Sequence, residues 1–122
     1  MQHANNFLAL VEEYRPSVKE VDINSVKTKL DNNETFDLID VREDHEWSQG
    51  HIPSAVHMSR GIIERDIEKA IPNKDTLIVL YCGGGFRSVL SAYNLQKMGY
   101  TSVISMDGGM RDWLNAGYKV TL

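Results

Sequence analysis

Short apolar runs alternate with amphipathic segments along most of this chain. Residues 77–81, Leu-Ile-Val-Leu-Tyr, are apolar throughout, as expected of a central parallel strand that is covered on both faces. Residues 61–70 carry apolar side chains at helical spacing and stop shortly before Pro72. Residues 88–98 form another such segment, and Gly99 follows where glycine commonly ends a helix. The pattern therefore predicts an α/β fold.

The remaining segments continue the alternation of strands and helices. Further strands are predicted at residues 18–21, 36–41, 55–58 and 103–106, and further helices at residues 25–31, 43–49 and 110–115. Because strand–helix–strand units connect as right-handed parallel crossovers, we expect a parallel sheet flanked by helices on both faces. Functional sites in such sheets form at the carboxyl ends of the strands.

One more amphipathic helix is predicted before the first strand. Asn5 and Asn6 can cap it, and Pro16 ends it. Its apolar face is expected to consist of Phe7, Leu10, Val11 and Tyr14. We interpret residues 1–17 as an amino-terminal helical extension packed against a domain that spans residues 18–122. A helix that binds a partner is the alternative.

Composition and charge narrow the class of protein. The chain has 122 residues, of which 42% are hydrophobic and 25% charged, which suits one compact domain. Thirteen basic and seventeen acidic residues give a net charge of −4, which argues against nucleic acid or an anionic membrane as the main partner. No apolar run approaches the roughly 20 residues of a membrane span. The amino terminus lacks the basic start of a signal peptide.

The chain has a single cysteine, Cys82. An internal disulfide, a CxxC redox pair and a zinc site built from several cysteines are therefore excluded. The histidines show no spacing typical of metal ligands. We expect a cytoplasmic protein that uses neither a metal nor a cofactor.

Cys82 lies in a glycine-rich loop between the apolar strand and a predicted helix. The residues after it are Gly83, Gly84, Gly85, Phe86, Arg87 and Ser88. Three consecutive glycines let backbone N–H groups turn toward one point, and the helix adds its positive end. A thiol in such a place loses its proton readily, so the loop predicts an activated cysteine nucleophile. Arg87 is spaced either to close the ring or to hold an anionic ligand. The alternative is a buried cysteine before a structural turn.

Other side chains are candidates for supporting roles around this loop. Asp40 and Arg42 follow a strand that should lie beside the cysteine strand, so we expect an ion pair that orients the loop. Alternatively, Arg42 steers an anionic donor. Ser88, at the start of the predicted helix, is a further supporting residue. Phe86 either forms an exposed apolar lip or folds back onto the domain, and Arg60 follows a strand end from which it can reach the site.

Four motifs in this order resemble those of single-domain rhodanese-like sulfurtransferases. They are Asp-Val-Arg-Glu at residues 40–43, Gly-His-Ile-Pro-Ser-Ala at 50–55, Tyr-Cys-Gly-Gly-Gly-Phe-Arg-Ser at 81–88 and Gly-Gly-Met-Arg-Asp-Trp at 108–113. The resemblance covers about residues 18–120. It implies a parallel, five-stranded, rhodanese-like α/β fold. It also implies that Cys82 carries sulfur as a persulfide and that the backbone N–H groups of residues 83–87 cradle that sulfur.

We therefore expect a sulfurtransferase that moves a sulfane sulfur from thiosulfate or a persulfide to a thiol or protein acceptor. Because the loop offers only one cation, Arg87, thiosulfate should bind weakly and a neutral or protein-bound persulfide should be the better donor. A cysteine phosphatase or arsenate reductase is one alternative. However, the Cys-x4-Arg loop of this chain is one residue shorter than the Cys-x5-Arg pattern of those enzymes. A non-catalytic sulfur-relay or binding module is the other.

Overall fold

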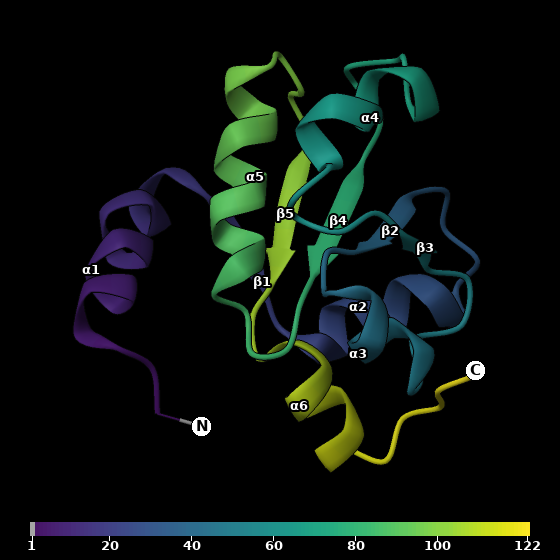
Figure 1. The fold of residues 1–122 in the computed structure, drawn as a ribbon. Coiled ribbons are helices and arrows are strands. Elements are labelled where there is room, and N and C mark those ends of the chain that lie inside the picture. The colour runs from purple at the N-terminus through teal and green to yellow at the C-terminus, as the bar shows by residue number, and fades with distance from the viewer. Residues whose placement is uncertain (1) are drawn as a thin grey trace.

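Five strands form one sheet in the order β1-β5-β4-β2-β3, and all neighbouring strands are parallel (Figure 1). The computed structural model describes residues 2–122. The strands are β1 (Lys19–Val21), β2 (Asp37–Asp40), β3 (Val56–His57), β4 (Ile78–Tyr81) and β5 (Val103–Met106). The predicted parallel sheet is confirmed, and each of its strands lies within the range that the sequence pattern indicated.

Helices cover both faces of the sheet, as predicted. They are α1 (Asn5–Tyr14), α2 (Ile23–Asp31), α3 (Asp44–Ser48), α4 (Ile63–Ala70), α5 (Arg87–Lys97) and α6 (Gly109–Asn115), and a short 3-10 turn, Arg15–Ser17, follows α1. Helices α1, α4 and α5 share one apolar core with the sheet, while α2 and α6 share the core on the opposite face.

Strand β4 contributes to both cores. Ile78 and Leu80 belong to the core under α1, α4 and α5, whereas Val79 and Tyr81 belong to the core under α2 and α6. Side chains alternate between the two faces of a strand, so a strand covered on both sides needs apolar residues at every position. This placement accounts for the uninterrupted apolar run.

Helix α1 packs along α5 on the outside of the domain (Figure 1). Val11 is completely buried in the core beneath it. The ring of Tyr14 lies 4.3 Å from that of Tyr93 on α5, measured between centroids. The amino-terminal segment is thereby anchored to the remainder of the fold.

Two details predicted for this helix are wrong. The helix begins at Asn5 itself, so Ala4 takes the capping position and no side chain caps the helix. Leu10 was expected on the apolar face but is 42% exposed. Successive residues of a helix are about 100° apart, and the buried stripe centred on Val11 leaves Leu10 at its solvent side.

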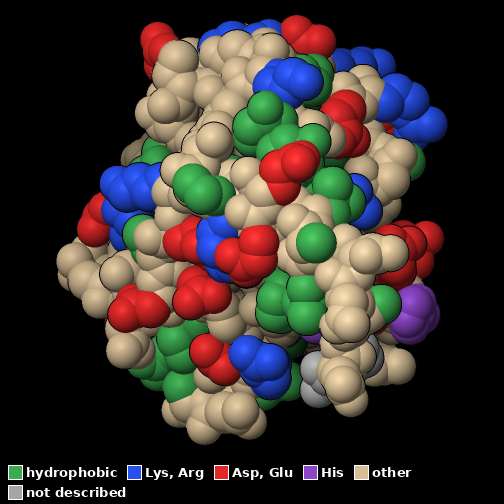
Figure 2. Space-filling model, turned by 90° about the vertical axis from the view of Figure 1, so that its left-hand side faces the viewer, with side chains coloured by type: hydrophobic (Ala, Val, Ile, Leu, Met, Phe, Trp, Pro, Cys, Tyr) green, Lys and Arg blue, Asp and Glu red, His purple; other side chains and the backbone are tan. Residues whose placement is uncertain are grey.

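The surface over α1 carries charges of both signs. Figure 2 shows acidic and basic side chains interleaved with apolar ones on this face, without a large field of one sign. No helix within residues 2–122 is long and apolar enough to cross a membrane.

Candidate active site around Cys82

Cys82 directly follows β4, the central strand, and is 1% exposed. The loop of residues 82–86 turns the chain into α5, which begins at Arg87. The buried strand fixes one end of the loop and the helix fixes the other. The sulfur therefore lies at the carboxyl edge of the sheet, beside the amino-terminal end of a helix, where peptide dipoles favour a negative charge.

The sulfur of Cys82 contacts both backbone and hydroxyl groups. The N–H of Gly85 donates a hydrogen bond to Sγ at 3.2 Å. The hydroxyl oxygen of Ser88 lies 3.5 Å from Sγ and 2.8 Å from the hydroxyl oxygen of Ser105 on β5. Both serines are buried. The hydrogen bond to Ser105 holds the Ser88 hydroxyl beside the sulfur, on the side that faces the interior of the domain.

The start of α6 holds the cysteine loop from a second side. The N–H of Met110 donates to the carbonyl oxygen of Cys82 at 2.8 Å, and the N–H of Arg111 donates to that of Gly83 at 2.9 Å. A Cβ atom at Gly109 would come within 2.5 Å of the Cys82 carbonyl oxygen. Only glycine permits this close approach, so Gly109 is needed where α6 meets the cysteine loop.

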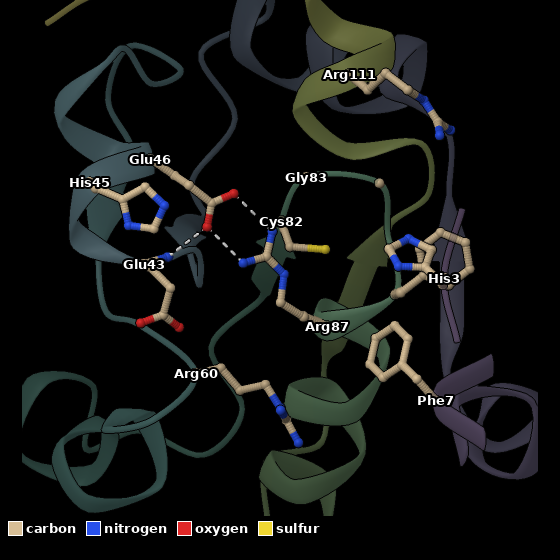
Figure 3. Close-up of a pocket in the computed structure, with 12 residues that line it drawn as sticks. His3, Phe7, Glu43, His45, Glu46, Arg60, Cys82, Gly83, Arg87 and Arg111 are labelled. Carbon is tan, nitrogen blue, oxygen red and sulfur yellow. Dashed lines mark hydrogen bonds and ion pairs between the residues drawn. The ribbon is translucent and has the colours of Figure 1, made fainter. Parts of the chain in front are cut away.

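Arg87 forms an ion pair with Glu46 on α3. The two guanidinium nitrogens donate to the two carboxylate oxygens at 2.7 and 3.0 Å (Figure 3). This hydrogen bonding is the main reason that the pKa of Glu46 falls to about 2 and that the pKa of Arg87 rises. The geometry makes Arg87 a brace between the loop and α3, because its charge is already paired.

Asp40 and Arg42 form a buried ion pair behind the site. The guanidinium of Arg42 donates to the Asp40 carboxylate at 2.8 to 3.1 Å and to the Gly50 carbonyl oxygen at 2.8 Å. Both residues are buried, and neither lines the cavity at Cys82. Arg42 therefore links β2 to the turn after α3 and does not face a ligand at Cys82.

A cavity of about 650 Å³ opens beside Cys82. Besides residues of the cysteine loop, its lining includes Arg60 and Arg111, together with His3 and Phe7 from the amino-terminal segment (Figure 3). Glu43, His45 and Glu46 complete the lining, so cationic, acidic and aromatic side chains from five separate parts of the chain surround the cavity. Within residues 2–122, no three His, Cys, Asp or Glu side chains are grouped so that they could hold a metal ion.

Most of the chain matches a known family. Residues 22–116 match the rhodanese-like domain. The chain belongs to the rhodanese-like domain family. The resemblance carried by the four sequence motifs is thereby confirmed.

Relatives of this rhodanese-like domain include sulfurtransferases. A sulfurtransferase of Allochromatium vinosum is 33% identical over 84% of this chain and 94% of its own length. The Bacillus subtilis protein YrkF, whose name proposes a sulfur-carrier role, is 35% identical over 83% of this chain, which spans only 54% of YrkF. The sulfurtransferase relative supports an enzyme of the rhodanese type, whereas the name of YrkF indicates a carrier.

A solved structure resembles the domain over almost its whole length. It is a Rhodopseudomonas palustris protein of unknown function, named as a candidate tyrosine phosphatase, with a TM-score of 0.88 and 25% identity. The similarity covers 99% of this chain and 98% of the other. It therefore includes α1 as well as the segment matched by the family.

Most of the site residues predicted from the sequence of this rhodanese-like domain lie close together in the structure. The three glycines, Phe86, Arg87 and Ser88 surround Cys82, and the ring of Phe86 folds back toward the amino-terminal segment. Asp40 and Arg42 lie behind the site, while Arg60 lines the cavity.

Sequence reasoning did not identify Glu46 as the partner of Arg87. The N–H of Glu43 donates to a Glu46 carboxylate oxygen at 3.1 Å, the spacing of a helix capping box. That local signal marks the start of α3. It carries no information on an ion pair with a residue 41 positions away. His3 and Phe7 were missed for the same reason, since only the packing of α1 brings them to the cavity.

Proposed function

We propose that Cys82 transfers sulfane sulfur through a persulfide intermediate. The Cys82 thiolate attacks the outer sulfur of a donor, the donor's S–S bond breaks, and the donor remnant leaves as sulfite or a thiolate. A thiophilic acceptor, such as a thiol or a carrier protein, then attacks the outer sulfur of the Cys82 persulfide and restores the thiolate. Atoms and charge balance in both steps without an oxidant or a reductant. In the cytoplasm, where thiols stay reduced, Cys82 would remain available for this cycle.

The observation that carries the proposal is the set of polar groups that surround the Cys82 sulfur. The Gly85 N–H donates directly to Sγ, the Ser88 hydroxyl lies beside it, and α5 points its amino-terminal end toward it. These fixed dipoles favour a negative charge on sulfur and on the outer sulfur of a persulfide.

The experiment is an intact-mass measurement after incubation with thiosulfate, followed by a reductant. We expect the chain to gain one sulfur atom, which the reductant removes. Cys82→Ser is the control, because a hydroxyl is close in size to a thiol but is not ionised near neutral pH. A variant that still gains sulfur, or a wild-type chain that gains none from any sulfane donor, would contradict the proposal.

A cysteine phosphatase is the second candidate, favoured by the name of the similar Rhodopseudomonas protein. The Cys82-to-Arg87 loop has four intervening residues, and Glu46 engages Arg87, so the loop's own guanidinium is not available to close around an oxyanion. We therefore expect no hydrolysis of p-nitrophenyl phosphate by a preparation that accepts sulfur. If the chain hydrolysed p-nitrophenyl phosphate in a Cys82-dependent way and gained no sulfur, the protein would be a phosphatase and not a sulfurtransferase.

A further inference from the structure

Three aromatic side chains form one wall of the cavity beside Cys82. His3, Phe7 and Phe86 all line it. The ring centroid of His3 lies 4.6 Å from that of Phe86 and 5.3 Å from that of Phe7, and the two phenyl centroids are 6.3 Å apart. These separations are typical of attractive aromatic pairs. We call His3, Phe7 and Phe86 the aromatic wall.

The wall stands across the cavity from the Glu46–Arg87 ion pair. In Figure 3, His3 and Phe7 lie on one side, Glu46 and its partner Arg87 lie on the other, and Cys82 lies between them. A molecule that presents sulfur to Cys82 can therefore lie against the aromatic rings without approaching the Glu46 carboxylate.

Packing holds the wall in position. Phe7 belongs to α1, in which Val11 is completely buried. At the end of this helix, Arg15 pairs with Glu20, and its guanidinium carbon lies 5.8 Å from the ring centroid of Phe86. Phe7 is thus held by an anchored helix, while Phe86 belongs to the cysteine loop. His3 and Phe7 precede residue 22, where the family match begins, so the rhodanese-like core does not itself supply them.

We propose that the aromatic wall selects the sulfur donor, and that the preferred donor is a small organic persulfide, R–S–SH, with an apolar R group. This inference rests on the proposed persulfide chemistry of Cys82. The volume of about 650 Å³ falls among those typical of sites for small organic ligands. Thiosulfate has no apolar part to place against three rings, whereas an alkyl or aryl group there removes apolar surface from water.

The transfer step balances with this donor. The Cys82 thiolate attacks the outer sulfur of R–S–SH, the S–S bond of the donor breaks, and R–S⁻ leaves with the bonding electron pair. Cys82 becomes Cys–S–SH, and the proton stays on the transferred sulfur. The aromatic wall makes no bond in this step. Its role is to position the donor so that the outer sulfur faces Cys82.

The test compares two donors, benzyl persulfide and thiosulfate, in single-turnover sulfur loading of the full chain followed by intact mass. In the double variant His3→Ala/Phe7→Ala, we expect the second-order loading rate with benzyl persulfide to fall roughly tenfold, because two ring contacts are lost. The rate with thiosulfate should stay within about twofold, since that donor does not use the wall. Leu10→Ala, on the exposed side of the same helix, is the matched control and should change neither rate.

The outcomes separate this inference from the proposed function. An equal fall with both donors, or no fall with benzyl persulfide, would overturn the role of the wall while sulfur transfer stands. A wild-type chain that loads from neither donor would overturn the proposed function itself. If the double variant does not fold, the single variant His3→Ala tests the role of the wall. It leaves the buried core intact and should slow loading from benzyl persulfide about threefold without affecting thiosulfate.

Discussion

Among the three glycines after Cys82, Gly85 has the most demanding position. Its φ of +95° lies in a region that side chains disfavour, and a Cβ there would come within 3.0 Å of the Gly108 nitrogen. Its N–H is also the one that donates to the sulfur. Gly84 has neither a positive φ nor a backbone atom in its way, so the run of glycines does not carry equal constraints.

We expect Gly85→Ala to destabilise the domain by about 1–3 kcal/mol and to lower the rate of sulfur transfer at least about tenfold. Strain at this residue turns its N–H away from Sγ. Gly117→Ala is the matched control, because Gly117 also has a positive φ, +75°, but lies in open space outside the site. Urea unfolding and sulfur loading measured on both variants check this. Equal activity of the two variants would show that the Gly85 N–H is dispensable.

The position of the loop around Cys82, between a buried strand and a helix, could be anticipated from sequence because the loop is local. Seven consecutive residues carry the nucleophile, the turn and the start of the helix, so their spacing alone defines the loop. The particular glycine with positive φ could not be identified in this way. That choice depends on where the Gly108 backbone lies, and Gly108 is distant in sequence.

At the scale of elements, the Glu46–Arg87 pair joins α3 to the first residue of α5. Both side chains are about a quarter exposed, at 27% and 28%. The pKa of Glu46 is held at about 2, below the roughly 4.3 of an unfolded glutamate. A carboxylate with a lowered pKa in the folded state stabilises the fold above its unfolded pKa. This contribution is lost as the pH falls toward the folded pKa.

We therefore expect Glu46→Gln to lower the free energy of unfolding by about 1–2 kcal/mol at pH near 7, after allowance for solvent screening. The difference from wild type should shrink steadily between about pH 5 and pH 2. Urea unfolding at several pH values measures it. Glu34→Gln is the control, because Glu34 pairs with Lys29 at 3.4 Å on the exposed surface and should contribute little. A difference that is independent of pH would contradict the ion-pair interpretation.

The order of elements was predictable, whereas contacts between them were not. The sequence pattern located the strands and α-helices of residues 2–122, although not the 3-10 turn Arg15–Ser17, because most of these elements bury an apolar face or stripe. Glu46 and Arg87 come from different helices, 41 residues apart, and only the tertiary fold brings them together. The same holds for the aromatic wall, in which Phe86 is separated from His3 and Phe7 by most of the chain.

At the scale of the whole molecule, the net charge of −4 and the local charges at the cavity act in opposite directions on an anionic donor. Arg60 and Arg111 line the cavity, and the side chain of Arg111 is 57% exposed. Glu43 also lines it, and Arg87 is already paired. The cavity therefore offers thiosulfate some attraction, but only from groups that water and salt screen readily.

We expect a high KM for thiosulfate that rises a few-fold between roughly 0.05 and 0.5 M salt, because the screening length shortens well below 10 Å over this range. The KM for benzyl persulfide should change much less, since apolar contact is not screened by salt. Arg60→Gln should raise the KM for thiosulfate and flatten its dependence on salt, because one of the screened cations is gone. Steady-state rates with cyanide as the acceptor give the KM values for both donors and for the Arg60→Gln variant at each salt concentration. Tight thiosulfate binding that salt does not weaken would mean that the dianion is held by buried hydrogen-bond donors of the loop rather than by these arginines.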